Sequence, residues 1–437
     1  MSEPIQSGKG MKLHTKILLG LAIGAAAGVA ANLTVGPGNP AVETFNFYVA
    51  VPVGQVFLRM LFMVVMPLVF ASISLGVAGL GDIRKVGRVG GKAIGYFLVT
   101  TAMAATLGLV IVNISRPWER VSPETREAMM TRFAADASTR VEAAGTTAKF
   151  GPDTFVNIVP RNPIDAAART DMLGIIFFGL IFGAALTLIA AEKAKPMIGW
   201  LEALVEVVIK IIHFAMLLAP FGVACLIFTV ASRFGFDLLI AVAAFVLTVL
   251  AALLAHVLIT LSAIIRFAIG LSPFTYFSRI KAALVTAFST SSSSATLPTA
   301  LEVAEKQLGV PRTVAGFVLP IGSTMCMNGT AIFEGITVIF LAEIFNVDLS
   351  IPQMAVVMVM AVITAIGAAG VPGGSIPLLV GILLMFGVPG EGIAIVLGVD
   401  RILDMSRTTV NVAGDISASV WVARSEGVWT PQDLPRS

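Results

Sequence analysis

Apolar runs of about 20 residues recur along the first two thirds of the chain, and no other feature limits the fold as strongly. A helix of about 20 apolar residues crosses the hydrocarbon core of a bilayer. The runs cover 13–33, 48–79, 91–114, 172–191, 198–228 and 237–269. Because lipid offers the backbone no hydrogen-bond partners, such runs predict an all-α integral membrane protein.

The composition agrees with this fold class. Of the 437 residues, 57% are hydrophobic and 13% are charged, whereas about a quarter of a soluble domain is charged. The first run has no polar cleavage region, so we interpret it as a transmembrane helix rather than a signal peptide. Cys225 and Cys326 provide no disulfide framework or paired metal motif, and the net charge of +3 with no basic tract gives no sign of nucleic-acid binding.

Lysine and arginine are distributed unevenly between the predicted loops. Loops 34–50 and 341–353 contain neither residue. Basic residues predicted to lie on the opposite side are at the N-terminus, 84–88, 193–195, Arg266, Arg279 and Lys281. Positive residues stay on the cytoplasmic side, which predicts cytoplasmic N- and C-termini in the cell's inner (plasma) membrane. Segment 115–171 has mixed charge and is either a partly ordered external loop or disordered.

Two later segments are interrupted before they are long enough to span. In 274–308 two short arms meet at the serine run 289–294, and in 353–388 they meet at the glycine- and proline-rich run 367–375. Paired interruptions are typical of transporter binding sites, because irregular backbone at membrane depth must be buried in protein or line a wet cavity. We predict two hairpins that enter from opposite faces; ordinary surface turns are the alternative.

The last apolar helix, near 391–424, carries a stripe of polar residues. Its members are Asp400, Asp404, Arg407, Asn411 and Asp415, with Arg401 beside them. Spacings of four, three, four and four put the five on one helical face. An ionisable residue inside a span costs at least ~2.5 kcal/mol, so the stripe should face a polar interior. A simple Asp404–Arg407 ion pair is the structural alternative.

The chemistry of the stripe suits an amino acid with an acidic side chain. Arg407 offers a planar fork for a carboxylate, and Asp404 accepts from an ammonium group. Asn411 and the serine-rich tip add neutral donors. Between the hairpins, 322–330 holds glycines and small polar residues within an apolar run; this predicts an unwound helix with carbonyls free for a cation, or else a helix kink.

These motifs resemble the glutamate transporter family, the dicarboxylate/amino acid:cation symporters, over nearly the whole chain. The segments that carry the resemblance are 66–72, 160–163, 219–223, 291–298, 370–373 and 404–415. The resemblance implies a homotrimer with eight transmembrane helices, two re-entrant helical hairpins and an elevator mechanism. The implied parts are scaffold helices in 1–80 and 172–230, a transport-domain helix in 81–114, an extracellular loop in 115–171, the remaining transport domain in 231–425 and a cytoplasmic tail in 426–437.

The resemblance also implies roles for individual residues. Arg407 and Thr330 would bind the side-chain carboxylate, and Asp404 and Thr408 would bind the amino group. The full substrate set is Arg407, Asp404, Thr408, Asn411, Thr330, Ser291, Ser292, Ser293, Val371 and Gly370. Neutral amino acid members lack the arginine and dicarboxylate members lack the aspartate, so aspartate or glutamate is expected. A C4-dicarboxylate or neutral amino acid symporter is the alternative.

The implied coupling ion is Na⁺, and no cofactor is implied. Family members usually read Asn-Met-Asp-Gly-Thr where this chain reads Cys-Met-Asn-Gly-Thr at 326–330. The implied sodium ligands are Thr100, Thr101 and Asn328 in one site, and Asp415, Asn411 and the carbonyl of Gly322 in a second. A third site uses mostly carbonyls, including those of Thr324 and Met327, and should persist. The first site has lost its formal charge, and a neutral thiol is a poor ligand for a hard cation, so we expect weak binding there. Phe97 also replaces a common tyrosine.

Glu334 lies one turn after Thr330 and matches a glutamate linked to proton coupling in eukaryotic family members. A carboxyl group in an apolar span is favoured in its neutral, protonated form. We therefore expect fewer sodium ions than usual, with a proton as a supplement. A channel or receptor is the competing class. No nucleophile–base pair or metal cluster indicates an enzyme, and the three histidines share no register.

Overall fold

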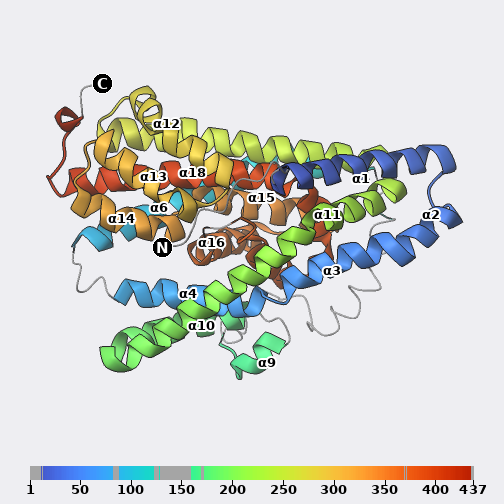
Figure 1. Cartoon of the computed structure of the whole chain (residues 1–437), viewed down its shortest axis with the longest axis horizontal. Helices are drawn as coiled ribbons and strands as arrows, with labels where there is room; N and C mark the ends of the chain where they lie inside the picture. Colours follow the sequence, from blue (N-terminus) through green and yellow to red (C-terminus); the bar gives the residue numbers. More distant parts are fainter. Residues whose placement is uncertain are drawn as a thin grey trace.

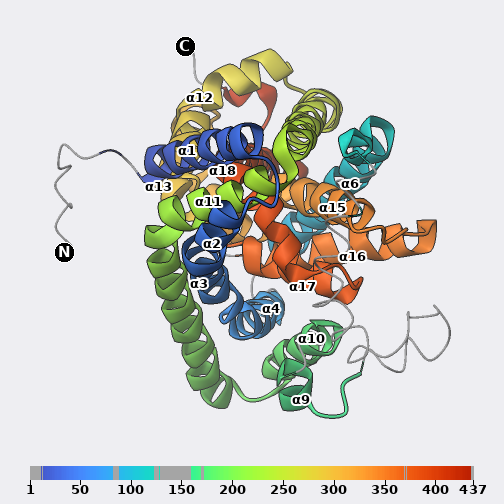
Figure 2. The same cartoon turned by 90° about the vertical axis from the view of Figure 1, so that its right-hand side faces the viewer.

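The protein is described by a computed structural model that covers residues 11, 13–81, 88–122, 127, 159–168, 172–368, 370 and 372–434. Within these residues all regular structure is helical. Figures 1 and 2 show a bundle whose helices run mostly along the long axis, with α11 crossing it obliquely. Predicted loop 115–171 lies largely outside the described residues.

The first half of the chain forms long apolar helices. Their bounds are α1 (Leu13–Val35), α2 (Pro40–Phe45), η1 (Asn46–Ala50), α3 (Val51–Phe62), α4 (Val65–Gly81), α6 (Arg88–Ser115), η2 (Pro117–Arg120), α9 (Pro163–Ala168), α10 (Met172–Leu188), α11 (Ala191–Ala255), η3 (His256–Leu261) and η4 (Ile264–Ile269). Helix α1 packs on α11 so closely that side chains at Gly20 and Gly24 would collide with the backbone of Pro220 and Ala224. Glycine permits this approach because it lacks a Cβ.

One predicted pair of spans is confirmed, and one predicted run differs from the structure. The runs 198–228 and 237–269 correspond to two candidate spans, Ala191–Phe236 and Leu238–Ile269, which meet near Gly235, where φ is +64° and the backbone is not helical. Glycine adopts this positive φ without strain, so the two spans are joined by a sharp kink rather than by a longer loop. The run 48–79 is divided by a turn at 63–64 between α3 and α4.

The second half consists of shorter helices. These are α12 (Pro273–Thr290), α13 (Ser293–Lys306), α14 (Arg312–Met325), α15 (Asn328–Ile344), α16 (Ile351–Gly367), α17 (Ile376–Met385), η5 (Gly390–Ile393), α18 (Ala394–Ser425) and η6 (Pro431–Asp433). Helices α12 and α13 pack together as one pair, and α16 and α17 as another. Their positions match the predicted arms; entry of the pairs into a membrane from opposite faces stays a prediction.

Local sequence explains where these arms end. Ser291 closes α12 in the left-handed region (φ 50°), and the Ser292 side chain then caps α13 by accepting from the amide of Ala295. Serine is a preferred N-cap because its oxygen satisfies a free amide of the first turn. Helix α16 starts with a capping box formed by Ser350 and Gln353.

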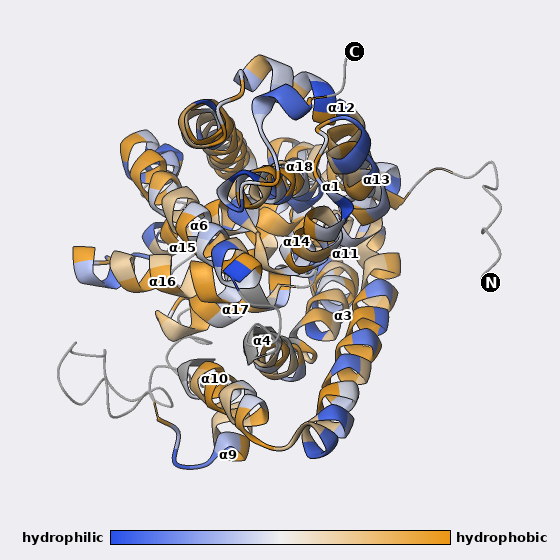
Figure 3. Ribbon diagram, turned by 90° about the vertical axis from the view of Figure 1, so that its left-hand side faces the viewer, coloured by the Kyte–Doolittle hydropathy of each residue, from blue (hydrophilic) through white to orange (hydrophobic). Residues whose placement is uncertain are grey.

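The described residues contain six helical stretches that are long and apolar enough to cross a membrane. Five of them have large outward faces, and Figure 3 shows hydrophobic residues on many outer helix surfaces. The sixth, Arg312–Ile344, has its most apolar window entirely buried. It is interrupted between α14 and α15 at Cys326 and Met327, whose backbone is not helical. The predicted unwinding is therefore confirmed, but it spans two residues rather than nine.

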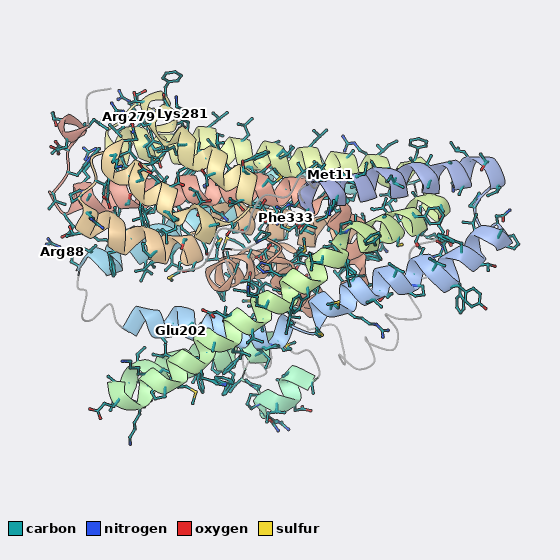
Figure 4. All side chains as sticks on the ribbon, in the orientation of Figure 1. Met11, Arg88, Glu202, Arg279, Lys281 and Phe333 are labelled. Carbon is teal, nitrogen blue, oxygen red and sulfur yellow. The ribbon has the colours of Figure 1, made fainter. Side chains whose placement is uncertain are left out.

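Basic side chains gather at one end of the bundle. Figure 4 labels Arg88, Arg279 and Lys281 near the same end, whereas Phe333 lies in the middle of the molecule. This placement agrees with the uneven distribution of lysine and arginine in the sequence. Assignment of that end to the cytoplasm stays a prediction.

Candidate functional site

A small cavity lies where the two hairpin tips meet the break between α14 and α15 and the polar face of α18. Its lining residues are Ser291, Ser293, Met327, Thr330, Ala368, Gly370, Ser375, Asp404, Thr408 and Asn411. All except Ala368 and Ser375 were candidates from the sequence. The structure thus brings together residues that are up to 120 positions apart in the chain.

Arg407 lies beside this cavity and is almost completely buried, with 1% of its surface exposed. Its Nη2 is 3.0 Å from Asp400 Oδ1 and 2.9 Å from Asp404 Oδ1. The guanidinium carbon also lies 3.8 Å from the centre of the Phe333 ring, a favourable cation–π position. Nε and Nη1 have no partner among the described residues. These donors suit a carboxylate.

Asp404 connects the charged helix to the second hairpin. Its Oδ2 accepts a hydrogen bond from the amide of Gly373 at 3.2 Å and lies 3.7 Å from Arg401 Nη1. The network that Asp404 forms with Arg401, Asp400 and Arg407 contains two carboxylates and two guanidinium groups. When all are ionised their charges cancel, which is how buried ionic groups become tolerable. The single Asp404–Arg407 pair considered as an alternative is thus part of a four-residue network.

Asn411 holds the start of α15. Its Oδ1 accepts from the amide of Gly329 at 2.7 Å, and its Nδ2 donates to Thr330 Oγ1 at 3.2 Å and to Met327 Sδ at 3.1 Å. Side-chain amides satisfy the free groups of a helix terminus in this way. The predicted neighbours Asn411 and Thr330 therefore touch.

The two hairpin tips touch directly. Ser292 Oγ donates to the carbonyl oxygen of Gly370 at 2.6 Å, and the amide of Ser294 donates to the same oxygen at 3.2 Å. Ser292 is thus engaged with the second tip, whereas Ser291 and Ser293 line the cavity. Val371, another substrate candidate, lies outside the described residues.

A second, uncharged polar cluster lies between α6 and the start of α15. Thr101 Oγ1 donates to Asn328 Oδ1 at 2.9 Å, and Thr100 Oγ1 approaches it at 3.3 Å. The Cys326 thiol is 3.9 Å from the same oxygen. The structure brings Thr100, Thr101 and Asn328 together, as the sequence predicts. Their oxygens carry no formal charge, so cation binding here would depend on dipoles alone.

Asp415 lies one helical turn beyond Asn411 and is buried. Its Oδ1 has no partner among the described residues, and a Cβ on Gly322 would come within 2.9 Å of that oxygen. The ring of Phe97 faces the same glycine. Gly322 therefore allows the backbone of α14 to approach a buried carboxylate, and hard cations prefer such oxygen ligands. The third predicted site uses backbone carbonyls, including those of Thr324 and Met327. These two residues lie at the break between α14 and α15, and their role in cation binding stays a prediction.

Glu334 is completely buried on α15. Its Oε2 lies 2.7 Å from Thr364 Oγ1 on α16, and its Oε1 has no partner among the described residues. The next residue towards the site is Phe333, whose ring contacts Arg407. Glu334 is thus close to the charged network without joining it.

Several residues in or beside the site were not singled out by the sequence analysis. Phe333 and Thr364 resemble ordinary apolar-helix residues, and Asp400 was recognised only as part of the stripe. Ser375 follows a glycine pair in the second tip, which marked a turn but not a lining residue. Their roles in the site depend on contacts between segments that are far apart in the chain. A helical pattern in the sequence shows only which residues share one face of that helix.

The fold and the site define a multi-pass membrane transporter. A model of the sodium:dicarboxylate symporter family matches residues 13–425, and the chain belongs to that family. It is 34% identical over 420 residues to the proton/sodium-glutamate symport protein of Geobacillus stearothermophilus, covering 96% of each chain.

Relatives with different stated substrates are about equally similar. The chain is 35% identical over 375 residues to the proton/glutamate-aspartate symporter of Escherichia coli, covering 86% of this chain and 85% of the relative. It is 35% identical over 376 residues to the C4-dicarboxylate transport protein of Bacillus subtilis, covering 86% and 87%. Overall identity therefore does not separate amino acid from dicarboxylate substrates, and the site residues must do so.

Proposed function

We propose that this protein is a secondary active symporter of acidic amino acids, aspartate or glutamate. The observation that carries the proposal is the pairing of Arg407 with Asp404 beside the cavity. The two unpartnered nitrogens of Arg407 would bind the substrate's side-chain carboxylate. Asp404, which lines the cavity, would accept from its ammonium group. A dicarboxylate has no ammonium group, so a buried aspartate would repel it.

The neutral donors complete the proposed binding site. Thr408 would share the ammonium group with Asp404, and Thr330 would assist Arg407. Asn411 and the backbone near Ser293 would hold the α-carboxylate. The contact between Ser292 and Gly370 closes the two tips over these groups, which supports a gating role for the second hairpin.

Na⁺ is the proposed coupling ion, with a proton as a supplement. Asp415 and the backbone at Gly322 form the strongest candidate cation site, because Asp415 supplies a buried carboxylate oxygen. The neutral cluster around Asn328 would bind Na⁺ weakly. Glu334 would carry the proton as a neutral carboxyl group. By family resemblance we further propose a homotrimer in which a transport domain, made of 81–114 and 231–425, moves as an elevator.

Competition for uptake tests the substrate assignment. Purified protein in liposomes is given labelled aspartate under an inward sodium gradient, with unlabelled glutamate, succinate or serine as competitor. Glutamate should compete, whereas succinate and serine should not. Strong competition by succinate would instead favour a C4-dicarboxylate carrier, to which the second guanidinium group of Arg401 would be suited.

Titration of uptake tests the coupling ions. Initial rates are measured against sodium concentration, with and without a pH gradient, for the wild type and Glu334→Gln. We expect a low-order sodium dependence and a pH effect that the variant lacks. A high-order sodium dependence that Glu334→Gln leaves unchanged would exclude the proton.

A further inference from the structure

Thr364 makes more hydrogen bonds as a donor than its single hydroxyl proton permits. Its Oγ1 lies 2.7 Å from Glu334 Oε2 and 2.7 Å from the carbonyl oxygen of Met360. Both oxygens are pure acceptors if Glu334 is ionised, and a hydroxyl group can donate to only one of them. Two short bonds are satisfied together only if Glu334 carries a proton and donates it to Thr364, while Thr364 donates to Met360.

The burial of Glu334 favours the same arrangement. The side chain is 0% exposed, and Oε1 has no partner among the described residues. An ionised carboxylate with a single hydrogen bond would be strongly destabilised in an apolar interior. A neutral carboxyl group needs one acceptor for its proton, and Thr364 supplies it.

Few charges face Glu334 from the helices packed against it. Arg407 on α18 is the charged group that acts on it, and Arg407 already pairs with Asp400 and Asp404. Helices α16 and α17 contain no ionisable side chain.

The remaining neighbours of α15 are also uncharged near this point. Helix α11 contacts α15 through Phe245, and no ionisable residue occurs between 238 and 255. Helix α6 faces the adjacent Gly335 with Ala105 and Leu109, far from its basic first turn. The charged residues of η2 are exposed. The proton state of Glu334 is therefore governed locally by Thr364 and Arg407.

We propose that Thr364 is a positioning residue that acts as a two-way hydroxyl switch for the coupled proton; this rests on the proposed proton coupling. In the protonated state Thr364 accepts from Glu334 and donates to Met360. On release, the O–H bond of the carboxyl group breaks, the proton leaves to water, and the Thr364 hydroxyl turns to donate to the carboxylate. The Met360 carbonyl keeps its backbone bond within α16, and the carboxylate keeps one hydrogen bond, from Thr364.

The switch also connects the proton to the second hairpin. Thr364 lies on α16, six residues before Gly370, which is bonded to Ser292 of the first tip. Glu334 lies on α15, which begins at the Asn411 contacts. Loss or gain of the proton reverses the direction of the hydrogen bond that links these two helices, so proton release and movement of the hairpin arm are expected to be coupled.

Three variants at two threonines test this role. Thr364→Val removes the hydroxyl with little change in shape, and Thr364→Ser keeps it. Thr337→Val is the matched control, because Thr337 is equally buried on α15 and its hydroxyl donates only to a backbone carbonyl, at 2.7 Å from Phe333. Uptake of labelled aspartate driven by a pH gradient is measured in liposomes, together with sodium-dependent substrate binding.

We expect Thr364→Val to slow proton-driven uptake about tenfold, the worth of one hydrogen bond to a charged group. Thr364→Ser should recover at least half of the wild-type rate, and Thr337→Val should match the wild type. Substrate binding at saturating sodium should change less than twofold in all three. Equal losses in Thr364→Val and Thr337→Val, or no loss in Thr364→Val, would overturn the proposal.

Infrared spectroscopy separates this inference from the proposed function. The carbonyl stretch of a protonated carboxyl group should be present in the wild type, absent in Glu334→Gln and shifted in Thr364→Val. Failure of the wild type to take up aspartate would contradict the proposed function but leave this signal to be tested. An infrared band insensitive to both substitutions would overturn the switch even if uptake were confirmed.

Discussion

Two buried polar clusters, one charged and one neutral, lie against α15, next to Phe333 and Asn328 respectively. The charged cluster joins Arg407 to Asp400 and Asp404, whereas the neutral cluster joins Thr100 and Thr101 to Asn328. The ion pairs of the charged cluster lie within α18, whereas the hydrogen bonds of the neutral cluster join α6 to α15. The charged cluster can exchange partners with an ionic substrate, but the neutral one offers a cation only dipoles. Similar burial therefore supports different ligands, because formal charge decides what each cluster can exchange.

Replacement of Arg407 should have the largest effect of the changes proposed, because it disrupts the charged cluster. Arg407→Ala leaves two buried carboxylates with Arg401 as the remaining cation of the network, and losing one partner of a buried pair costs about 3–5 kcal/mol. Aspartate uptake should fall at least about 100-fold, measured as initial rates in liposomes. Arg233→Ala, which breaks a remote pair with Glu43, is the control and should retain uptake. Undiminished transport by a correctly assembled Arg407→Ala protein would contradict the site.

Neutralising the carboxylate should separate amino acids from dicarboxylates. Asp404→Asn keeps the side-chain shape and removes the charge that would hold the ammonium group. Aspartate affinity should drop about tenfold or more, the usual worth of a hydrogen bond to a charged group. Succinate should compete better than in the wild type, as measured by inhibition of labelled uptake. Equal effects on both solutes would argue that Asp404 has only a structural role.

Adding a negative charge to the neutral cluster should make it a stronger sodium site. Asn328→Asp places a carboxylate next to Thr100 and Thr101, so the sodium concentration for half-maximal uptake should fall about tenfold. Asn346→Asp adds the same charge at an exposed left-handed position and serves as the control. An unchanged sodium titration would show that the cluster does not bind sodium even when charged.

The smallest expected effect is on thermal stability, and it comes from a charged cluster at the surface. Beyond the end of α18, Glu426 lies 2.5 Å from Lys92 and 2.7 Å from Arg88, and hydrogen bonds from these bases lower the pKa of Glu426 to about 2. Its usual value is about 4.3, so the stabilisation is present above pH 4.3 and is lost as pH falls towards 2. Exposed pairs contribute little and are screened by salt.

The corresponding variant is Glu426→Gln. Its thermal unfolding in detergent should begin slightly below that of the wild type at pH 7, and the difference should disappear near pH 2. Added salt should also reduce it. A difference that persists unchanged at low pH would show that the carboxylate charge is not responsible.

The sequence alone determined the class of fold and much of the site. Apolar run length predicted membrane helices, and the fixed period of a helix placed Asp404, Arg407 and Asn411 on one face. The serine run and the glycine- and proline-rich run located both tips, because these residues end helices through local backbone preferences. Such features depend on neighbours within a few residues, so they can be predicted from the sequence.

Only the tertiary structure decided which distant residues meet. It joined the two tips through Ser292 and Gly370, placed Phe333 under Arg407, and set Thr364 against Glu334. It also joined two expected spans through a sharp kink at Gly235. These contacts depend on how helices pack in three dimensions, and helical periodicity specifies a helix's own face but not the residue that will lie opposite it.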